Sequence, residues 1–378
     1  MTEIKLFDAT NIDELVWPES QEGLFAKKLL VPLIQNGVDA YFKNIKTTMK
    51  LMSIDSLILP ITINDEEMDN SYVCSFYSYY IGLGLNAAEN LKNVFLKNSL
   101  QVLLKALGRF LKLGKIDKVV SINNWLFSTN IHPQLSKEQV FSIRTFIQNQ
   151  FPHHAIVFRS INEMEEYSCV NALKNNQFDL VATRQIFFTD PKTPKVFESR
   201  LFKSDLKFLQ TTEYELADLD AKSQDELSKS LALYNALYLD KYSLFNPQLN
   251  EKLIQLLADQ KLFTFKTLKK NGQIEGIVGL YSMYGTMISP FFGYNTKISE
   301  QVGLYRLLST ILSLEAKNRG ELFHQSSGAS FYKSIRKATA SLEYSAVYTK
   351  HLPFNRRISW KALQALMNHF AIRWMRKY

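Results

Sequence analysis

The chain has 378 residues, of which 46% are hydrophobic and 21% charged, and this composition excludes a largely disordered protein. Forty-five Lys and Arg against 36 Asp and Glu leave a net charge of +9, which suits an anionic partner but is also common in soluble enzymes. The only cysteines, Cys74 and Cys169, are far apart in sequence. No disulfide framework or zinc cage is therefore expected, which fits a reducing cytoplasm. The length predicts two domains.

Neither the start of the chain nor its longest uncharged run indicates a membrane-spanning or secreted protein. The first residues, MTEIKLFDATNIDEL, lack the basic and apolar regions of a signal peptide. The run from Gly276 to Thr296 is uncharged but contains four glycines and Pro290. Two buried strands joined by a turn around Tyr284 explain it better than a transmembrane helix. We expect a cytoplasmic protein.

In the first half, predicted strands and helices alternate, which indicates an α/β layer. Apolar residues at three- and four-residue spacing, among them Val94, Phe95 and Leu103, predict a helix over 91–113. Ser136, with Gln139 three residues later, predicts a capped helix start. The expected strands are 72–82, 116–122, 155–161 and 178–188, and the expected helices are 91–113, 136–149 and 163–174.

The segment TDPKTPK, 189–195, holds two prolines among polar residues and is the predicted domain boundary. Asn246 followed by Pro247 predicts a helix start. The expected helices beyond the boundary are 196–209, 224–242, 247–259, 300–318 and 328–336, and the expected strands are 213–219, 262–268, 274–281, 286–295, 321–325 and 342–348. The domains expected are 1–190, 191–350 and a basic tail helix over 351–378. No exact internal repeat is visible.

From residue 262 onward, the order of motifs resembles the core of the GNAT acyltransferases. A turn and strand (KNGQIEGIVGL) are followed by a strand, a loop and a helix (SPFFGYNTKISEQVGLYRLLSTILSLEAKNRG), and then by a strand, a tyrosine-bearing helix and a last strand (ELFHQSSGASFYKSIRKATASLEYSAVY). The stretch ESRLFKSDLKFLQTTEYELADL, with Lys203 and Lys207, is similar to the segment between the halves of tandem-GNAT proteins such as the Fem-type aminoacyl transferases. The resemblance implies two GNAT-like α/β domains in tandem, the C-terminal one more complete.

The resemblance also implies a pyrophosphate loop for an acyl-CoA co-substrate, where backbone N–H groups at a helix start hold the anion. The matching residues are Gly303, Leu304, Tyr305 and Arg306. Glu300 stands where the family has Gln or Arg and would repel a phosphate, and Tyr305 would crowd a position that is usually small. Arg306 could still bind a phosphate. Alternatively, Gly303 only starts a helix and Arg306 is a solvated charge.

Tyr332 occupies the position at which the family tyrosine protonates the leaving thiolate, although Arg336 replaces the glycine usually found four residues later. A phenol with a pKa near 10 can do so without special tuning. The alternative is a tyrosine that only packs on the sheet. If the chain is a GNAT-type transferase, we expect the strands 286–295 and 321–325 to be parallel neighbours that separate beside Gly303, with the Tyr332 hydroxyl pointing into the gap.

Four further side chains are candidates for the same site. Ser326 and Ser327 could bind a substrate or cap the following helix. His324 could act as a general base or be a structural residue of its strand. Glu275 lies where some family members place a base and is a weaker candidate. No histidine or carboxylate spacing predicts a metal site.

The segment after Glu343 has no acidic residue and carries Lys350, Arg356, Arg357, Lys361 and further basic residues. Ile358, Ala362, Leu366, Phe370 and Trp374 form an apolar stripe. The tail helix could pack on its own domain, or bind an anionic membrane surface, a tRNA or an acyl carrier protein. A peripheral position at the inner membrane face is therefore an alternative, and no DNA binding is expected.

Two functions from different classes remain. The first is an N-acyltransferase that moves an acyl group from acyl-CoA, or from an acyl or aminoacyl carrier such as a tRNA, to an amine. The second is a degenerate GNAT-fold binding protein without catalysis, which the altered loop at Glu300 and Tyr305 favours.

Overall fold

The computed structural model describes residues 3–165 and 167–372. The chain forms two compact units. Unit 1 falls within 1–183, 243–248 and 343–377, and unit 2 within 184–242 and 249–342. Neither unit is a continuous stretch of sequence.

The sheet of unit 1 is antiparallel except for one parallel pair. Its strand order is β1 (Ile4–Phe7), β2 (Thr48–Ile54), β3 (Leu57–Asp65), β4 (Lys118–Ile122), β5 (Ala155–Asn162) and the second half of β12 (Thr339–Tyr348). The strands β4 and β5 are parallel, and all other neighbours are antiparallel. The strand β6 (Asp179–Thr189) begins in unit 1 and continues into unit 2.

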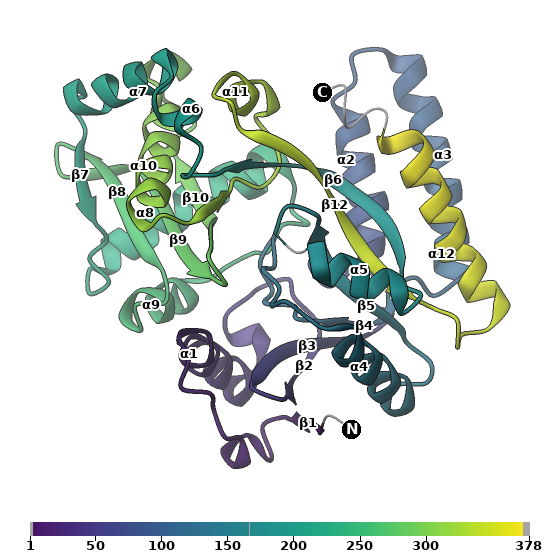
Figure 1. The fold of residues 1–378 in the computed structure, drawn as a ribbon. Coiled ribbons are helices and arrows are strands. Elements are labelled where there is room, and N and C mark those ends of the chain that lie inside the picture. The colour runs from purple at the N-terminus through teal and green to yellow at the C-terminus, as the bar shows by residue number, and fades with distance from the viewer. Residues whose placement is uncertain (1–2, 166, 373–378) are drawn as a thin grey trace. The chain divides into compact units, whose positions relative to one another are not determined.

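Both faces of this sheet are covered by helices, because successive strand residues point to opposite sides. Val120 packs with Ile143 in one hydrophobic cluster. Its neighbour Val119 packs with Leu111 and Trp360 in another. The helices of unit 1 are α1 (Gln21–Asn36), α2 (Leu83–Glu89), α3 (Val94–Leu113), α4 (Lys137–Gln150), α5 (Tyr167–Asn175) and α12 (Phe354–Leu366) (Figure 1).

Unit 2 repeats the strand order of unit 1. The order is β7 (Glu215–Asp218), β8 (Thr264–Lys270), β9 (Gln273–Met283), β10 (Thr286–Tyr294), β11 (Leu322–His324) and the end of β6. Again only one pair, β10 and β11, is parallel. The helices are α6 (Pro194–Phe197), α7 (Arg200–Thr211), α8 (Gln224–Asn235), α9 (Glu251–Asp259), α10 (Leu304–Arg319) and α11 (Ser330–Ile335).

The repeated order confirms the α/β class and the expected pair of similar α/β units, although the sequence shows no exact internal repeat. Each unit is completed by a strand from the other half of the chain. In unit 1, β5 pairs with β12, and in unit 2, β11 pairs with β6. The domain ranges 1–190, 191–350 and 351–378 stay predictions.

The strand predicted over 72–82 is wrong, because this segment turns and then forms a helix that continues into α2. The buried carboxylate of Asp117 accepts hydrogen bonds from the Ser75 hydroxyl (2.7 Å) and the Tyr77 N–H (3.0 Å). The Ser75 hydroxyl accepts one from the Ser78 N–H (2.9 Å). These bonds satisfy donors at a helix start, which outweighs the β propensity of the aromatic residues.

The uncharged run forms the hairpin β9–β10, as predicted, with a turn at Tyr284 and Gly285, whose φ angles are 50° and 79°. Within the described residues, no helix is long and apolar enough to cross a membrane. The capped start at Ser136 is also confirmed, with Gln139 completing the capping box. The start predicted at Asn246 is wrong, since Asn250 caps α9 by accepting from the Leu253 N–H (3.1 Å).

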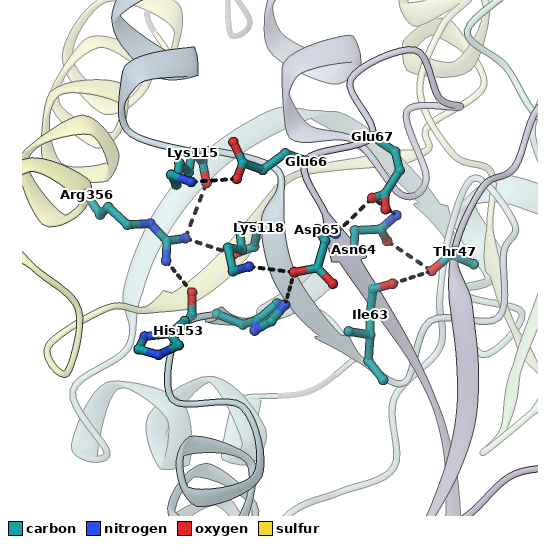
Figure 2. Close-up of polar contacts among 11 residues, drawn as sticks. Thr47, Ile63, Asn64, Asp65, Glu66, Glu67, Lys115, Lys118, His153 and Arg356 are labelled. Carbon is teal, nitrogen blue, oxygen red and sulfur yellow. Dashed lines mark hydrogen bonds and ion pairs between the residues drawn. The ribbon is translucent and has the colours of Figure 1, made fainter.

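The tail helix α12 packs on unit 1, although not through the predicted stripe. Trp360 and Leu363 are buried in the core, whereas Ile358 is exposed. The guanidinium of Arg356 donates to backbone carbonyls near the starts of β4 and β5, including those of Lys118 (2.9 Å) and His153 (Figure 2). One basic residue of the tail thus anchors the helix. Trp374 and the side chain of Phe370 lie outside the described part of the structure.

Candidate functional site

The parallel pair β10–β11 in unit 2 is short, and the chain diverges where it ends. Pairing runs from Thr286 and Leu322 to Ile288 and His324. After that point, the N–H of Gln325 donates to the Phe187 carbonyl of β6 (2.8 Å), so this segment follows β6. The strand β10 instead bulges between Ile288 and Phe291 before continuing to Tyr294. The expected parallel pairing is confirmed, and β10 leaves its neighbour within unit 2.

Two helices of unit 2 cover opposite faces of β9 and β10. A Cβ on Gly293 of β10 would lie 2.7 Å from the backbone of α8, so the sheet face that includes Gly293 packs closely against α8. A Cβ on Gly276 would lie 3.2 Å from Leu308 of α10. Because Gly276 pairs with Tyr294, Tyr294 shares the α10 face. The face that carries the predicted site is therefore the one beneath α10.

Several aromatic rings lie on this face, beyond the point at which β10 and β11 stop pairing. The Tyr305 ring, one residue into α10, lies 5.6 Å from that of Phe292 and 6.4 Å from that of Tyr294. Tyr332, from α11, meets Tyr305 edge to face at 5.0 Å. Burial raises the pKa of Tyr305 far above its usual value. Tyr305, which was expected to crowd a phosphate-binding loop, instead packs its ring against Phe292 and Tyr294 of β10.

Tyr332 is half-buried and stays protonated. Burial, followed by smaller effects of Arg336 and Asp205, leaves its pKa raised to about 12. The Arg336 guanidinium lies 3.5 Å from the centre of the ring, a cation–π arrangement. A phenol in this state can donate a proton but is not a base at neutral pH. The predicted position of its hydroxyl in the gap stays a prediction.

Asp205 of α7 joins the predicted loop to the tyrosine helix. Its side chain is only 2% exposed. Its carboxylate accepts from Arg306 Nε (2.5 Å), and from Arg336 Nε (2.7 Å) and Nη2 (3.1 Å). Because Arg306 and Arg336 both bind the one carboxylate of Asp205, the three side chains together carry a net charge of +1 beside Tyr332. Arg306 is therefore not a simply solvated charge.

Asp205 was not among the predicted site residues. Its signal is a single carboxylate among the apolar positions of a basic helix, three residues after Phe202 and next to Leu206. A buried carboxylate in such a place needs a positively charged partner. Only the tertiary structure brings Arg306 and Arg336 to it.

Gly303 has φ +75°, the left-handed region, and starts α10. A Cβ there would lie 3.0 Å from the Phe208 ring, so an apolar ring is packed against the glycine. Leu304 is buried in the core, and Glu300 is exposed just before the helix. These residues give the loop little resemblance to an anion cradle, apart from the guanidinium of Arg306.

His324 lies fully buried at the last pair of β11, with its ring 4.6 Å from that of Phe188. Its Nδ1 accepts from the Ser326 N–H (2.9 Å), so the neutral ring carries its proton on Nε2. Burial and, to a smaller extent, Arg184 and Lys333 lower its pKa to about 3. A histidine so tuned is a weak base at neutral pH, which favours a structural or hydrogen-bond-donating role.

The loop after His324 is organised by Lys333, a residue that the sequence analysis did not single out. Its buried ammonium donates to the carbonyls of Gln325 (2.7 Å), Ser326 (3.2 Å) and Ser327 (2.8 Å). Burial, with Arg184 nearby, lowers its pKa to about 7. The Ser327 side chain is exposed, and the cap residue of α11 is Ala329 rather than a serine. The two serines therefore contribute backbone carbonyls.

Glu275 lies on β9, one strand away from the divergence. Its carboxylate accepts from Asn295 Nδ2 (2.7 Å), and its carbonyl accepts from the Asn295 N–H (2.9 Å). These bonds hold the chain directly after β10. Within the described residues, no group of three His, Cys, Asp or Glu side chains could hold a metal ion.

No protein-family model matches the sequence, and no curated protein sequence matches it. Among solved structures, FemX aligns over 60% of this chain and 80% of its own, with 8% identity and a TM-score of 0.46. L-PGS from Bacillus licheniformis aligns over 60% and 77%, with 14% identity and a TM-score of 0.44. A GCN5-related N-acetyltransferase from Kribbella flavida aligns over 62% and 83%, with 12% identity and a TM-score of 0.34.

Proposed function

We propose that the protein is an N-acyltransferase that moves an acyl group from a carrier-bound ester or thioester to an amine, with the donor held in unit 2. The observation that carries the proposal is the divergence of β10 from β11 after Ile288 and His324. A strand edge that leaves its neighbour offers free backbone groups to an extended donor arm. Tyr332, in the helix that follows β11, supplies the phenol.

In the proposed reaction, the amine nitrogen attacks the acyl carbon and forms the C–N bond. The C–S or C–O bond to the carrier breaks, and the leaving atom takes a proton from the Tyr332 hydroxyl. The ammonium formed by the attack then returns a proton to the tyrosine, so that atoms and charge balance. Because its pKa is raised to about 12, Tyr332 is protonated at neutral pH, and it is better matched to an alkoxide leaving group than to the less basic thiolate.

The residues of the loop favour a donor other than coenzyme A. The Phe208 ring beside Gly303, the packed ring of Tyr305 and the exposed Glu300 all disfavour a pyrophosphate at this helix start. The positive charge left over by Arg306, Arg336 and Asp205 still suits an anionic carrier. We therefore place an acyl or aminoacyl carrier, such as a tRNA, ahead of acyl-CoA as the donor.

Isothermal titration with acetyl-CoA and oleoyl-CoA, alongside filter binding of aminoacyl-tRNA, tests the donor. We expect no heat with either thioester and retention of the charged tRNA. Transfer to hydroxylamine, a small general amine acceptor, then tests the chemistry. Tyr332→Phe is expected to lower the rate of carrier release about 100-fold or more. Tyr284→Phe, in the turn before β10, is the matched control and should leave the rate unchanged.

A degenerate, non-catalytic binding protein is the second candidate. It is favoured by the bonding of both arginines to Asp205 and by the filled space beneath Tyr305. On this view, no donor is consumed, and Tyr332→Phe changes neither binding nor any turnover. Measurable transfer that depends on the Tyr332 hydroxyl would reject it.

A further inference from the structure

The helix α3 of unit 1 exposes a continuous apolar face. Phe95, Val102 and Leu113 are 83%, 68% and 78% exposed. They are spaced by 7 and 11 residues, close to whole helical turns, and so lie along one line. Leu96, Leu103 and Phe110 extend this line to a stripe and are also exposed. The opposite side of α3 packs on unit 1 through Gly108 and Leu111.

A basic stripe runs beside the apolar one. The helix has four basic residues and no acidic residue in its 20 positions. Lys97 pairs with Glu89, and Lys112 lies over the Tyr77 ring. Lys105 and Arg109, one turn apart, are exposed. An exposed apolar face bordered by Lys and Arg is the pattern of a helix that lies in a membrane interface.

The neighbouring helix α12 continues both properties. The two helices lie side by side (Figure 1), joined through the shared packing of Leu111 with Trp360. Phe354 and Ile358 of α12 are exposed large apolar residues, and Arg357 is exposed between them. Exposed apolar and basic residues are thus present on two helices that pack against each other. We call this surface the α3–α12 face.

We propose that the α3–α12 face docks on an anionic membrane surface, with α3 lying in the plane of the interface. The charge argues for this occupant. A second copy of the chain would set the basic stripe of α3 opposite an identical stripe with no acidic residue to pair with it. Anionic headgroups neutralise the basic residues while the acyl boundary takes up the apolar side chains. This inference is independent of the proposed transferase reaction.

Flotation of the full-length protein with lipid vesicles tests the proposal. We expect binding to vesicles of equal phosphatidylglycerol and phosphatidylcholine, no binding to pure phosphatidylcholine, and loss of binding at high salt. The triple variant Phe95→Ser, Val102→Asn, Leu113→Ser should lower the vesicle-bound fraction at least tenfold. The double variant Lys105→Glu, Arg109→Glu should do the same by charge reversal.

Matched controls come from α1 of the same unit. Leu24→Ser and Lys27→Glu alter an exposed leucine and an exposed lysine away from the α3–α12 face, and should bind as the wild type does. If the triple variant does not fold, the charge-reversal pair carries the test alone. Failure of the wild type to float with anionic vesicles overturns the proposal. So does a stable dimer, seen by light scattering, that the same variants dissociate.

Discussion

His324 contacts Phe188 with its ring and accepts the Ser326 N–H at Nδ1, and its burial has a consequence for stability. Its pKa in the folded protein is about 3, below the value near 6.5 of an unfolded chain. Between pH 6.5 and pH 3, the unfolded state therefore binds the additional proton. The stability contributed by the neutral ring is present above pH 6.5 and is lost as the pH falls through this window.

We predict that His324→Asn weakens this pH dependence, because the Asn side chain keeps an acceptor near the Nδ1 position but does not titrate. Going from pH 7 to pH 4, the wild type should lose about 3 kcal/mol more of its free energy of unfolding than the variant does. Urea unfolding at each pH measures the difference. Parallel losses in the two proteins would show that His324 titrates normally and is not buried as described.

At the scale of one element, α10 has a left-handed glycine at each end. Gly303 has φ +75° and lies against the Phe208 ring, while Gly320 has φ +68° and has open space around the position of a Cβ. Both tolerate these angles because glycine has no Cβ. Of these two glycines, Gly303 alone is also closely packed against a neighbouring side chain, and it alone lies at the proposed donor loop.

Alanine at the two ends should therefore cost different amounts of stability. Gly320→Ala is expected to lower the free energy of unfolding by about 1 kcal/mol through backbone strain alone. Gly303→Ala should cost about 1 kcal/mol more, because Phe208 must move. In Phe208→Ala, the additional cost at Gly303 should disappear. Equal costs at the two ends in the wild-type background would contradict the tight packing at Gly303.

In the whole molecule, each unit depends on both halves of the chain. The strand β12 completes the sheet of unit 1, and β6 completes that of unit 2. The core of unit 1 also needs Trp360 and Leu363 from α12. An exposed sheet edge and a missing core helix make an isolated half unstable and prone to aggregate.

We predict that residues 1–190 and 191–378, produced separately, give no cooperative thermal unfolding, whereas co-production yields a soluble one-to-one complex. Circular dichroism and size-exclusion chromatography measure both. As a control, a protease site within the exposed segment 192–195, cut after folding, should leave the two pieces associated. A half that unfolds cooperatively by itself would show that its sheet does not need the exchanged strand.

The strands and helices from 264 to 348 could be predicted closely from the sequence, because alternating and helical apolar periods, the Tyr284 turn and the glycines around α10 are local signals. The sequence also placed Tyr332, Tyr305 and Arg306 in the order of the family that the chain resembles. It misread 72–82, where a distant carboxylate, Asp117, starts a helix. The tertiary structure alone decided the strand exchange, the bonding of Asp205 to two arginines and the enclosure of Lys333. It also decided that apolar residues of α3, whose spacing predicted a helix, are exposed. Each of these depends on which distant segment becomes a neighbour, and periodicity along the chain carries no record of that.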